Sequence, residues 1–395
     1  MKGWRVWRHF DYVLLLVTIL LIAYGVLMIY SANQGSPDTR LQGLWRRQAI
    51  VGAVGVGIIF LLAAFPRDYQ WLGDFWWLAY ALAVAMLVLV LFFGESEIGA
   101  VSGWFDLGFL RIQPSYLAMN LLTISVGRIL SRGRSKRKQS EAPVLGMPKT
   151  TLGAVNGEDA RPDLISYAAS GGMTLLLAAL VFLEPDMATA AVFVAMWLAM
   201  LSQSSIPIRY LIATVVLGLG SLIPLWQLMG RFPYMRERIM GFLSPDPTSD
   251  AVYQVRQALI AIGSGGLWGK GLGQGTQSQL RYLPVRHTDF IFSVLAEELG
   301  FAGVMLLFAL YIILFFRLLR IIVITPDGFG KMIVTGTLAM ILFQLVINVG
   351  MNLDQLPVAG LPLPFISYGP AALLTIMVGI GMAENVVMRH RKLEF

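Results

Sequence analysis

Ten apolar segments divide this chain, and they limit its fold more than any other feature of the sequence. A helix that crosses a bilayer needs roughly 20 mostly apolar residues, so 395 residues have room for about ten such helices. Hydrophobic residues make up 57% of the chain and charged residues only 13%, which is unlike a soluble domain. We therefore predict an all-α, polytopic membrane helical bundle. The predicted helices cover residues 11–31, 48–65, 71–93, 113–130, 164–183, 186–203, 208–228, 288–316, 331–351 and 364–388.

The fifth and sixth segments are separated only by Glu184-Pro-Asp186. Proline lacks a backbone N–H group, so it either ends a helix or kinks it. These three residues therefore predict either a tight turn at a membrane face or one kinked helix. The second possibility would change the number of spans.

Lysine and arginine indicate how the bundle is oriented. They gather near both termini and in the loop 131–162, which contains the run Arg132-Gly-Arg-Ser-Lys-Arg-Lys138. Because cytoplasmic loops of membrane proteins carry an excess of these residues, we predict that both termini and this loop are cytoplasmic. The loop is also rich in glycine, proline and polar residues, so we interpret it as a flexible linker within one domain, 1–395. The long loop 229–287 is then extracytoplasmic.

Composition also excludes several kinds of site. The chain has no cysteine, which excludes disulfides and cysteine-bound metals. Its three histidines, His9, His287 and His390, are too few for a histidine-rich zinc site. The net charge of +7 is accounted for by the cytoplasmic loops, so binding to nucleic acid is not expected.

Asp289 is the leading catalytic candidate. It stands where the polar loop gives way to the apolar segment 288–316, directly after Arg286, His287 and Thr288. A carboxylate at a membrane edge still meets water, so it can act on a substrate whose head is in water and whose tail is in lipid. On a helix Glu297 would lie about 12 Å further along the axis, whereas a retaining carboxylate pair needs about 5 Å. A lone base therefore fits an inverting displacement.

Basic residues next to the apolar segments are candidates for binding phosphate. Arg231, Arg236 and Arg238 follow the seventh segment, and Arg46-Arg47 precedes the second. Arginine presents a fork of donors that matches phosphate oxygens, so these residues could clamp a pyrophosphate. They could equally be interfacial anchors whose charged ends reach the membrane surface. The sequence leaves both interpretations open.

Two further stretches are rich in glycine or proline. Residues 263–275 contain seven glycines around Lys270, but the spacing does not match a nucleotide-binding loop. We predict a close-packed re-entrant turn there, from which Lys270 could meet a phosphate. Residues 350–369 contain three prolines and could either form one wall of a cleft or simply break a helix. In the first case Asn352 and Ser367 would supply neutral hydrogen bonds.

Taken together, these stretches resemble the SEDS family (shape, elongation, division and sporulation), most closely its elongation branch. The resemblance runs in order through nearly the whole chain. The stretches that carry it are Phe10-Asp-Tyr12, Arg47-Gln48, Gly103-Trp-Phe-Asp-Leu-Gly108, Gln113-Pro-Ser115, Glu184-Pro-Asp186, Arg238 with Phe242-Leu-Ser-Pro245, Tyr253-Gln254, Gly263-Ser-Gly-Gly266, His287–Gly300 and Pro357–Gly369.

The resemblance implies ten helices and a peptidoglycan glycosyltransferase that polymerises lipid II with loss of undecaprenyl pyrophosphate. It also implies a class B penicillin-binding protein as partner, a bacterial plasma membrane location, a divalent cation (Mg²⁺ or Mn²⁺) and no organic cofactor. Asp289 matches the family's essential aspartate. The residues expected to bind substrate are Arg47, Gln113, Arg238, Lys270, His287 and Ser367, and those expected to support the site are Asp186 and Glu297.

The chain departs from the family pattern at charged positions. Gln-Pro-Ser is usually followed by Glu and, three residues later, by Lys, but here Tyr116 and Met119 stand at these positions. Val285 and Pro370 replace a usual glutamate and glycine. Two other functions therefore stay open: a lipid II flippase, and a catalytically impaired scaffold for the penicillin-binding protein.

Overall fold

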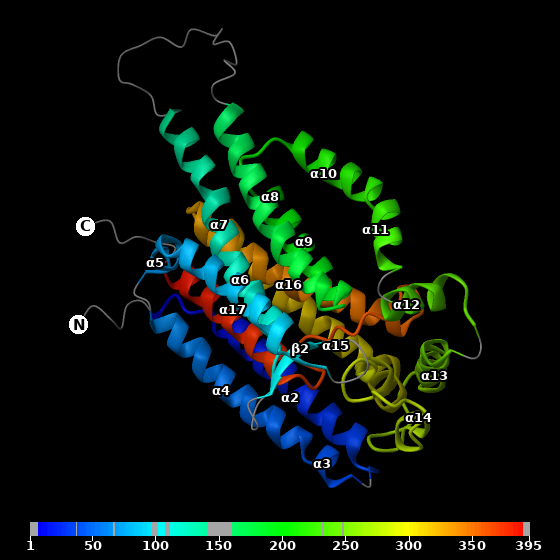
Figure 1. Ribbon diagram of the computed structural model, residues 1–395. Coiled ribbons are helices and arrows are strands. Elements are labelled where there is room, and N and C mark those ends of the chain that lie inside the picture. Colours follow the sequence, from blue (N-terminus) through cyan, green and yellow to red (C-terminus); the bar gives the residue numbers. More distant parts are fainter. Residues whose placement is uncertain are drawn as a thin grey trace.

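The computed structural model is a tilted bundle of helices with one small sheet (Figure 1). It describes residues 7–36, 38–65, 68–96, 102–106, 111–140, 160–230, 233–246 and 249–389. The helices are α2 (Tyr12–Asn33), α3 (Thr39–Gln42), α4 (Leu44–Ala64), α5 (Gln70–Asp74), α6 (Trp76–Phe93), α7 (Pro114–Ser140), α8 (Ala160–Leu183), α9 (Met187–Ser202), α10 (Ile208–Gly220), α11 (Leu222–Met229), α12 (Pro233–Leu243), α13 (Asp250–Ser264), α14 (Thr276–Gln279), α15 (Ile291–Ile324), α16 (Gly328–Asn352) and α17 (Pro370–Met388).

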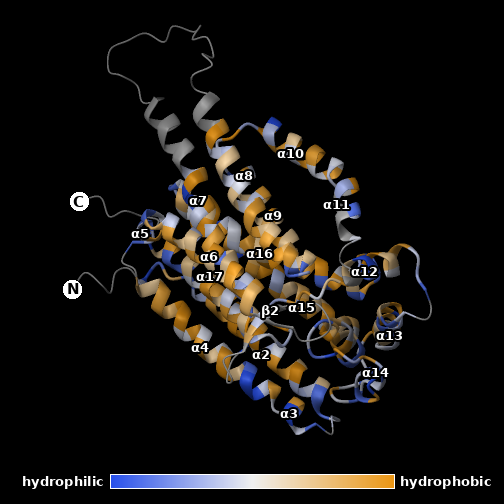
Figure 2. Ribbon diagram, viewed as in Figure 1, coloured by the Kyte–Doolittle hydropathy of each residue, from blue (hydrophilic) through white to orange (hydrophobic). Residues whose placement is uncertain are grey.

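The predicted all-α membrane bundle is confirmed, because every apolar segment forms a helix. Within the described residues, seven helices are long and apolar enough to cross a membrane, and α9 and α10 are shorter apolar helices. The hydrophobic residues run along the helices, whereas hydrophilic residues gather near their ends (Figure 2). The chain is therefore an integral, multi-pass membrane protein.

Several boundaries differ from the prediction: α15 continues to Ile324, α17 begins only at Pro370, and the third segment is divided at Phe75 into α5 and α6. Helix α7 continues to Ser140, so the first part of the expected linker 131–162 is helical, and residues 141–159 lie outside the described part. The seventh apolar segment is divided at Ser221 into α10 and α11. Gly218 and Gly220 directly precede this break, and glycine is a poor helix former.

Glu184-Pro-Asp186 forms a tight turn, which removes the alternative of one kinked helix. Helix α8 ends at Leu183 and α9 begins at Met187, and the two pack side by side. Trp197 Nε1 donates to Ser170 Oγ at 3.1 Å, across the turn. The two helices are therefore antiparallel.

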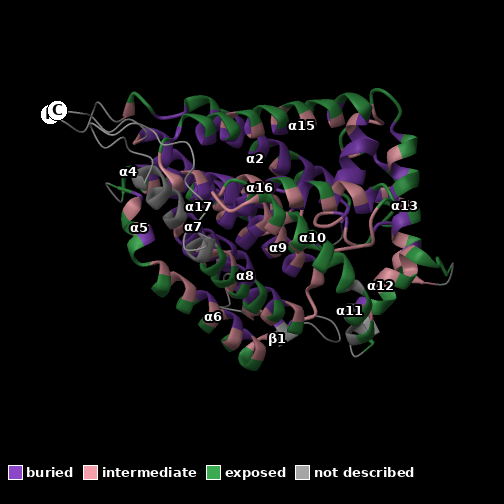
Figure 3. Cartoon of the chain, turned by 90° about the horizontal axis from the view of Figure 1, so that it is seen from above, coloured by how far each residue is buried: buried purple, intermediate pink, exposed green. Residues whose placement is uncertain are grey.

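The core lies on α16 and α17, which are surrounded by the other helices. Helix α17 packs on α4, and α16 packs on α7, α9 and α15. Buried residues lie on the inner faces, whereas exposed residues follow the outer faces of α6, α10 and α15 (Figure 3). Many exposed side chains on these outer faces are large and apolar, as lipid contact requires.

A buried charge cluster ties the chain ends to the bundle. Asp11 caps α2, and its carboxylate accepts hydrogen bonds from Arg317 Nε at 3.0 and 2.8 Å. The Asp11 N–H donates to Glu384 Oε2 at 3.0 Å. These contacts join α2, α15 and α17 at the end of the bundle where both termini lie (Figure 1). An even number of membrane spans places both termini on the same side of the membrane.

The small sheet lies between α6 and α7. Its strands are β1 (Glu95–Ser96), β2 (Ser102–Asp106) and β3 (Arg111–Ile112), paired antiparallel in that order. Trp104 faces Glu95 across the first pair, and Phe105 faces Ile112 across the second. The sheet brings the chain back to Gln113, at the start of α7.

Candidate functional site

The backbone of Asp289 is held by two asparagines of α16. Asn348 Nδ2 and Asn352 Nδ2 both donate to the Asp289 carbonyl oxygen, at 3.1 and 3.0 Å. Ser293 Oγ donates to Asn352 Oδ1 at 2.6 Å, which fixes the amide that holds Asp289. The Asp289 side chain is only partly buried and forms no ion pair with any described residue. The structure therefore fixes the main chain, and the carboxylate interacts with Thr288 but has no counterion in contact among the described residues.

The proline-rich segment after α16, residues 353–369, also contacts the backbone next to Asp289. Ser367 Oγ donates to the Thr288 carbonyl at 2.6 Å and accepts from Leu363 N–H at 2.8 Å. Gln48, buried on α4, donates to the Ser367 carbonyl at 3.1 Å. Ser367 is itself buried and engaged, so it positions the residue before Asp289 rather than pointing into open space.

Asp186 and Arg238 supply the nearest charges to Asp289. Burial raises the pKa of the Asp289 carboxyl, the nearby Arg238 guanidinium partly offsets this, and Asp186 adds to it. Burial also raises the pKa of Asp186, although its hydrogen bonds favour the ionised form. A group of two carboxylates and one arginine therefore gathers from α9, α12 and the start of α15.

Asp186 is fixed by its own partners. It caps α9 by accepting from Thr189 N–H at 3.0 Å, and Gln113 Nε2 donates to its Oδ2 at 3.0 Å. Its neighbour Glu184 is fully buried, and burial raises the pKa of that carboxyl to about 9. Glu184 is therefore uncharged at neutral pH, whereas Asp186 acts electrostatically on Asp289 and Gln113 contacts Asp186.

Arg238 lies against the proline-rich segment. A Cβ at Gly360 would lie 3.2 Å from Arg238 Nη1, and Gly360 has a φ of +70°. Glycine adopts this left-handed conformation without strain. Gly360 therefore gives the guanidinium room on the wall that also carries Ser367. Arg231 lies outside the described residues.

His287 is adjacent to Asp289 but carries no positive charge at neutral pH. Burial lowers the pKa of its imidazole to about 4, and the charge of Arg286 adds to the effect. Its carbonyl accepts from Tyr368 N–H at 2.9 Å. His287 can therefore act on a substrate through a neutral hydrogen bond. Arg286 is buried and donates to the Ala32 carbonyl at 2.7 Å, so it holds the loop to α2.

Arg47 is exposed near the beginning of α4, which starts at Leu44 and so includes Arg46 and Arg47. The buried Gln48 follows it and contacts the proline-rich wall. The helix therefore directs Gln48 inward and leaves Arg47 at the surface.

Lys270 and Glu297 pair with each other. Lys270 Nζ lies 2.8 Å from Glu297 Oε1, and Thr276 Oγ1 and Gln277 N–H also donate to that oxygen. Glu297 is fully buried. The ion pair occupies the Lys270 ammonium and fixes the glycine-rich turn to α15. Neither residue is among the charges that act on Asp289.

The glycine-rich turn is close-packed, as predicted, and interlocks with a break in α15. Gly300 has a φ of +65° inside α15, which frees helical backbone groups. The N–H groups of Lys270 and Gly271 donate to the carbonyls of Glu297 and Glu298, at 3.0 and 2.9 Å. A Cβ at Gly269 would collide with the backbone of Glu298. This interlock anchors the part of α15 that follows Asp289.

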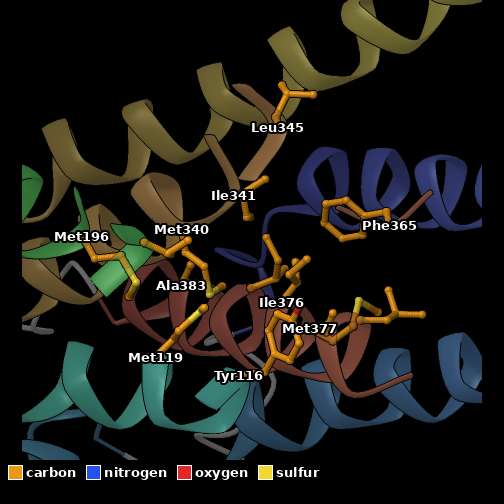
Figure 4. Packing of buried hydrophobic residues seen from close by; sticks show 14 of the residues in the cluster. Tyr116, Met119, Met196, Met340, Ile341, Leu345, Phe365, Ile376, Met377 and Ala383 are labelled. Atoms are coloured by element: carbon orange, nitrogen blue, oxygen red, sulfur yellow. The ribbon is translucent and has the colours of Figure 1, made fainter. Parts of the chain in front are cut away.

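Tyr116 and Met119 occupy the positions where the sequence pattern predicts charged residues. Both are buried in the apolar cluster between α7 and α17 (Figure 4). Tyr116 lies within electrostatic range of Asp186 and Asp289, and Gln344 Nε2 lies 3.7 Å from Met119 Sδ. A neutral phenol therefore borders the two carboxylates.

Asn348 was not predicted as a site residue. Its role depends on Asp289, which lies 59 residues away in the chain. A signal was available, because Gln344, Asn348 and Asn352 recur every four residues on an apolar helix and so share one face. Polar side chains repeated on one face of a membrane helix indicate a buried polar contact.

Comparison with known proteins identifies the family. The profile of the FtsW, RodA and SpoVE family, described as cell cycle proteins, matches residues 11–392. The peptidoglycan glycosyltransferase MrdB of Escherichia coli K12 is 34% identical over 98% of this chain and 95% of its own. The peptidoglycan glycosyltransferase RodA of Treponema pallidum is 30% identical over 96% of this chain and 98% of its own.

Solved structures agree with this assignment. A chain from a peptidoglycan synthase complex that coordinates polymerisation and crosslinking is 28% identical, with a TM-score of 0.72 over 96% of this chain and 98% of that one. The rod shape determining protein RodA of Thermus thermophilus is 27% identical, with a TM-score of 0.66 over 97% of this chain and 98% of that one. From its sequence and its fold alike, this chain belongs to the FtsW, RodA and SpoVE family, which is the SEDS family.

Proposed function

We propose that this chain is a peptidoglycan glycosyltransferase that polymerises lipid II into glycan strands for cell-wall elongation and cell shape. Its family membership and the activity named for its relatives support the reaction class. The single observation that carries the proposal is the Asp289 carboxyl, which is partly buried and has no counterion in contact among the described residues, while six hydrogen bonds fix the chain around it. These buried polar contacts hold the backbone around a single acid.

The proposed location is the bacterial inner membrane, with Asp289 facing the outside of the cell. The arrangement of lysine and arginine supports cytoplasmic termini, and α15, which begins two residues after Asp289, starts at the end of the bundle opposite the start of α2 and the end of α17 (Figure 1). A lipid-linked sugar would keep its chain along the apolar helices and its head at this end. The apolar outer faces of the helices therefore match the lipid chain of the substrate, and the polar end of the bundle matches its sugar head.

Asp289 would act as the general base. Its carboxylate takes the proton from a sugar hydroxyl of one lipid II molecule, and the oxygen attacks the anomeric carbon of the other. The bond from that carbon to the pyrophosphate oxygen breaks, and undecaprenyl pyrophosphate leaves with the electron pair. A raised pKa favours this role, because it brings the basicity of the carboxylate closer to neutral pH. A single base is sufficient for inversion.

Arg238 would stabilise the charge that develops on the leaving pyrophosphate. An arginine fork placed beside phosphate oxygens acts most strongly where charge appears in the transition state. The exposed Arg47, at the start of α4, would hold the pyrophosphate of a bound substrate in the same way, and His287 would add a neutral hydrogen bond. Lys270 would contribute indirectly, through its ion pair with Glu297.

A divalent cation, Mg²⁺ or Mn²⁺, would depend on the substrate. The described residues contain no group of three or more His, Cys, Asp or Glu side chains that could hold a metal. Magnesium is often bound by only one or two carboxylates together with substrate phosphates. Asp186 is the residue that would hold it, and the cation would neutralise pyrophosphate charge. No step requires an organic cofactor.

The proposed partner is a class B penicillin-binding protein, which would crosslink the new strand. The similar chain in a synthase complex that coordinates polymerisation and crosslinking supports such a partner. Co-purification with that transpeptidase is the corresponding measurement.

The proposal is tested with purified protein, its partner and labelled lipid II. Wild type is expected to form polymer that a muramidase degrades, and Asp289→Asn is expected to form none. Equal polymer from both proteins would remove Asp289 as the base. Asp250→Asn, which neutralises an exposed carboxylate on α13, is the matched control and should keep full activity.

A scaffold without activity is the second candidate, and the buried Tyr116 and Met119 favour it, because they replace charged family positions. In that case wild type forms no polymer, and restoring the pair with Tyr116→Glu and Met119→Lys restores polymerisation. Activity of wild type would exclude the scaffold.

A further inference from the structure

A cavity outside the Asp289 group lies between α12, α13 and the segment that follows α16. Its volume is about 140 Å³, far more than the roughly 10–15 Å³ that one water needs. Phe242, Val252 and Pro357 give it apolar walls. Arg238 lines one side, and the same residue acts electrostatically on Asp289. The cavity is therefore a neighbour of the proposed reaction site.

Two opposite charges line this cavity and do not neutralise each other. Arg256 comes from α13 and Asp354 from the turn after α16, and both are exposed. Neither side chain forms a hydrogen bond or an ion pair with any described residue, so they lie farther apart than a salt bridge. With Arg238, which acts on Asp289, the lining carries two cations and one anion, and Arg256 and Asp354 are available for a ligand.

Asp354 is held in place by its backbone. Its φ of +55° lies in the left-handed region, which aspartate tolerates better than most residues. Its N–H donates to the Met351 carbonyl at 3.3 Å. The Asp354 carboxylate on this turn and the Arg256 guanidinium on α13 therefore form a pair of binding groups with fixed backbones.

We propose that this cavity binds a peptide end that carries both a carboxylate and an ammonium group. Arg256 binds the carboxylate through its guanidinium fork, and Asp354 binds the ammonium group. The inference deepens the proposed function, on which it rests, because the peptide is then the arm of the sugar substrate. Arg238, shared by the cavity and the Asp289 group, sets the peptide arm beside the reacting sugar.

Ligands with a single charge fit the pair of Arg256 and Asp354 less well. Asp354 opposes a phosphate or pyrophosphate, and Arg256 opposes a simple cation, since like charges repel. A group with both charges satisfies both residues at once. The pair therefore favours a peptide end over a phosphate group.

The test uses a soluble probe, acetyl-Ala-Lys, which has a free carboxylate and a free ammonium group. Its binding to the detergent-solubilised full chain is measured by saturation-transfer NMR, beside its C-terminal amide and its Nε-acetyl form. Wild type is expected to bind the parent probe about tenfold more tightly than either blocked form, because each loses one charge-assisted hydrogen bond.

Two variants separate the two contacts. Arg256→Gln should lose the preference for the free carboxylate and keep that for the free ammonium group, and Asp354→Asn should do the reverse. Asparagine also tolerates the left-handed turn, so the fold is retained. Arg40→Gln and Asp250→Asn remove exposed charges outside the cavity and should keep both preferences.

Three results would overturn the proposal: no binding of the probe to wild type, preferences unchanged in both variants, or stronger displacement of the probe by inorganic phosphate than by unlabelled peptide. No turnover is needed for this measurement. Absence of polymerisation with these binding preferences intact would contradict only the proposed reaction, and polymerisation without them would contradict only the peptide site.

Discussion

The two ends of the bundle carry similar charged groups in opposite arrangements. At the end with the termini, Arg317 contacts Asp11 directly, with Nη2 2.6 Å from Oδ2, and Glu384 accepts from the Asp11 backbone. At the other end, Arg238 lies near Asp289 without an ion pair between them. Both ends have two carboxylates and one arginine, but only the first set is closed.

This difference separates a structural charge cluster from a chemical one. Removal of one member of a buried ion pair strongly destabilises the fold, because the other charge is left buried without a partner. An acid whose pKa is raised by burial, as that of Asp289 is, costs folding free energy when ionised, and such groups gather at functional sites. The contrast predicts opposite effects of the same substitution, aspartate to asparagine, at the two ends.

The largest expected effect is on activity at the open end. Asp289→Asn should lower the rate of lipid II polymerisation about 10²–10⁴-fold, because it removes a general base. Its melting temperature should be equal to or above that of wild type, since burial raises the pKa of Asp289 and ionisation opposes folding at neutral pH. Rate and melting temperature measured on one preparation test both. A lower melting temperature would show that Asp289 belongs to a closed cluster.

The second effect is on stability at the closed end. Asp11→Asn should lower the free energy of unfolding by about 2–3 kcal/mol, below the usual range for a buried pair because the Arg317 side chain is 18% exposed. Asparagine still caps α2, so the loss reports the ion pair. The rate per folded molecule should stay near that of wild type.

The exposed pair of Arg128 with Asp74 is the matched control for this change. Its atoms lie 2.9 Å apart, but the Asp74 side chain is 60% exposed. Asp74→Asn should change the free energy of unfolding by less than about 1 kcal/mol. Equal losses from Asp11→Asn and Asp74→Asn would mean that the inner cluster is not closed.

A smaller effect is expected at Ser367, which holds the backbone next to Asp289. Ser367→Ala removes the donor to the Thr288 carbonyl and the acceptor for Leu363 N–H, so about a tenfold loss of kcat is expected as Asp289 becomes less well positioned. Ser264→Ala, which removes a hydroxyl bonded only within α13, serves as control. A change in KM alone, with kcat retained, would contradict the positioning role.

The sequence predicted the features that depend on local chemistry. Apolar length located the helices, and proline at residue 185 between two acids located the turn that caps α9 with Asp186. Asp289 was predicted as a site residue because an ionisable residue at the edge of a membrane segment usually has a function. The close-packed turn around Lys270 followed from glycines that leave room for backbone contact.

Contacts between distant elements could not be predicted in the same way. Lys270 was expected to meet phosphate, but it pairs with Glu297, 27 residues later. Asn348 and Asn352 hold Asp289 only because α16 packs on α15. The break at Ser221 and the extension of α7 to Ser140 also went unpredicted, since apolar length alone does not set where a helix ends.

The pH dependence of polymerisation tests most directly whether Asp289 works as an ionised base. Its pKa is raised above the ordinary aspartate value of about 3.9, so the rate should fall as pH is lowered through that raised value. His287 stays neutral above pH 4, because its pKa is about 4.

The matched variant is Asp186→Asn, which keeps the cap of α9 but removes a charge that raises the pKa of Asp289. The account predicts that the acidic limb of wild type has its midpoint above the ordinary aspartate value and moves to lower pH in Asp186→Asn. A rate that stays constant down to pH 4, in protein that remains folded, would contradict it.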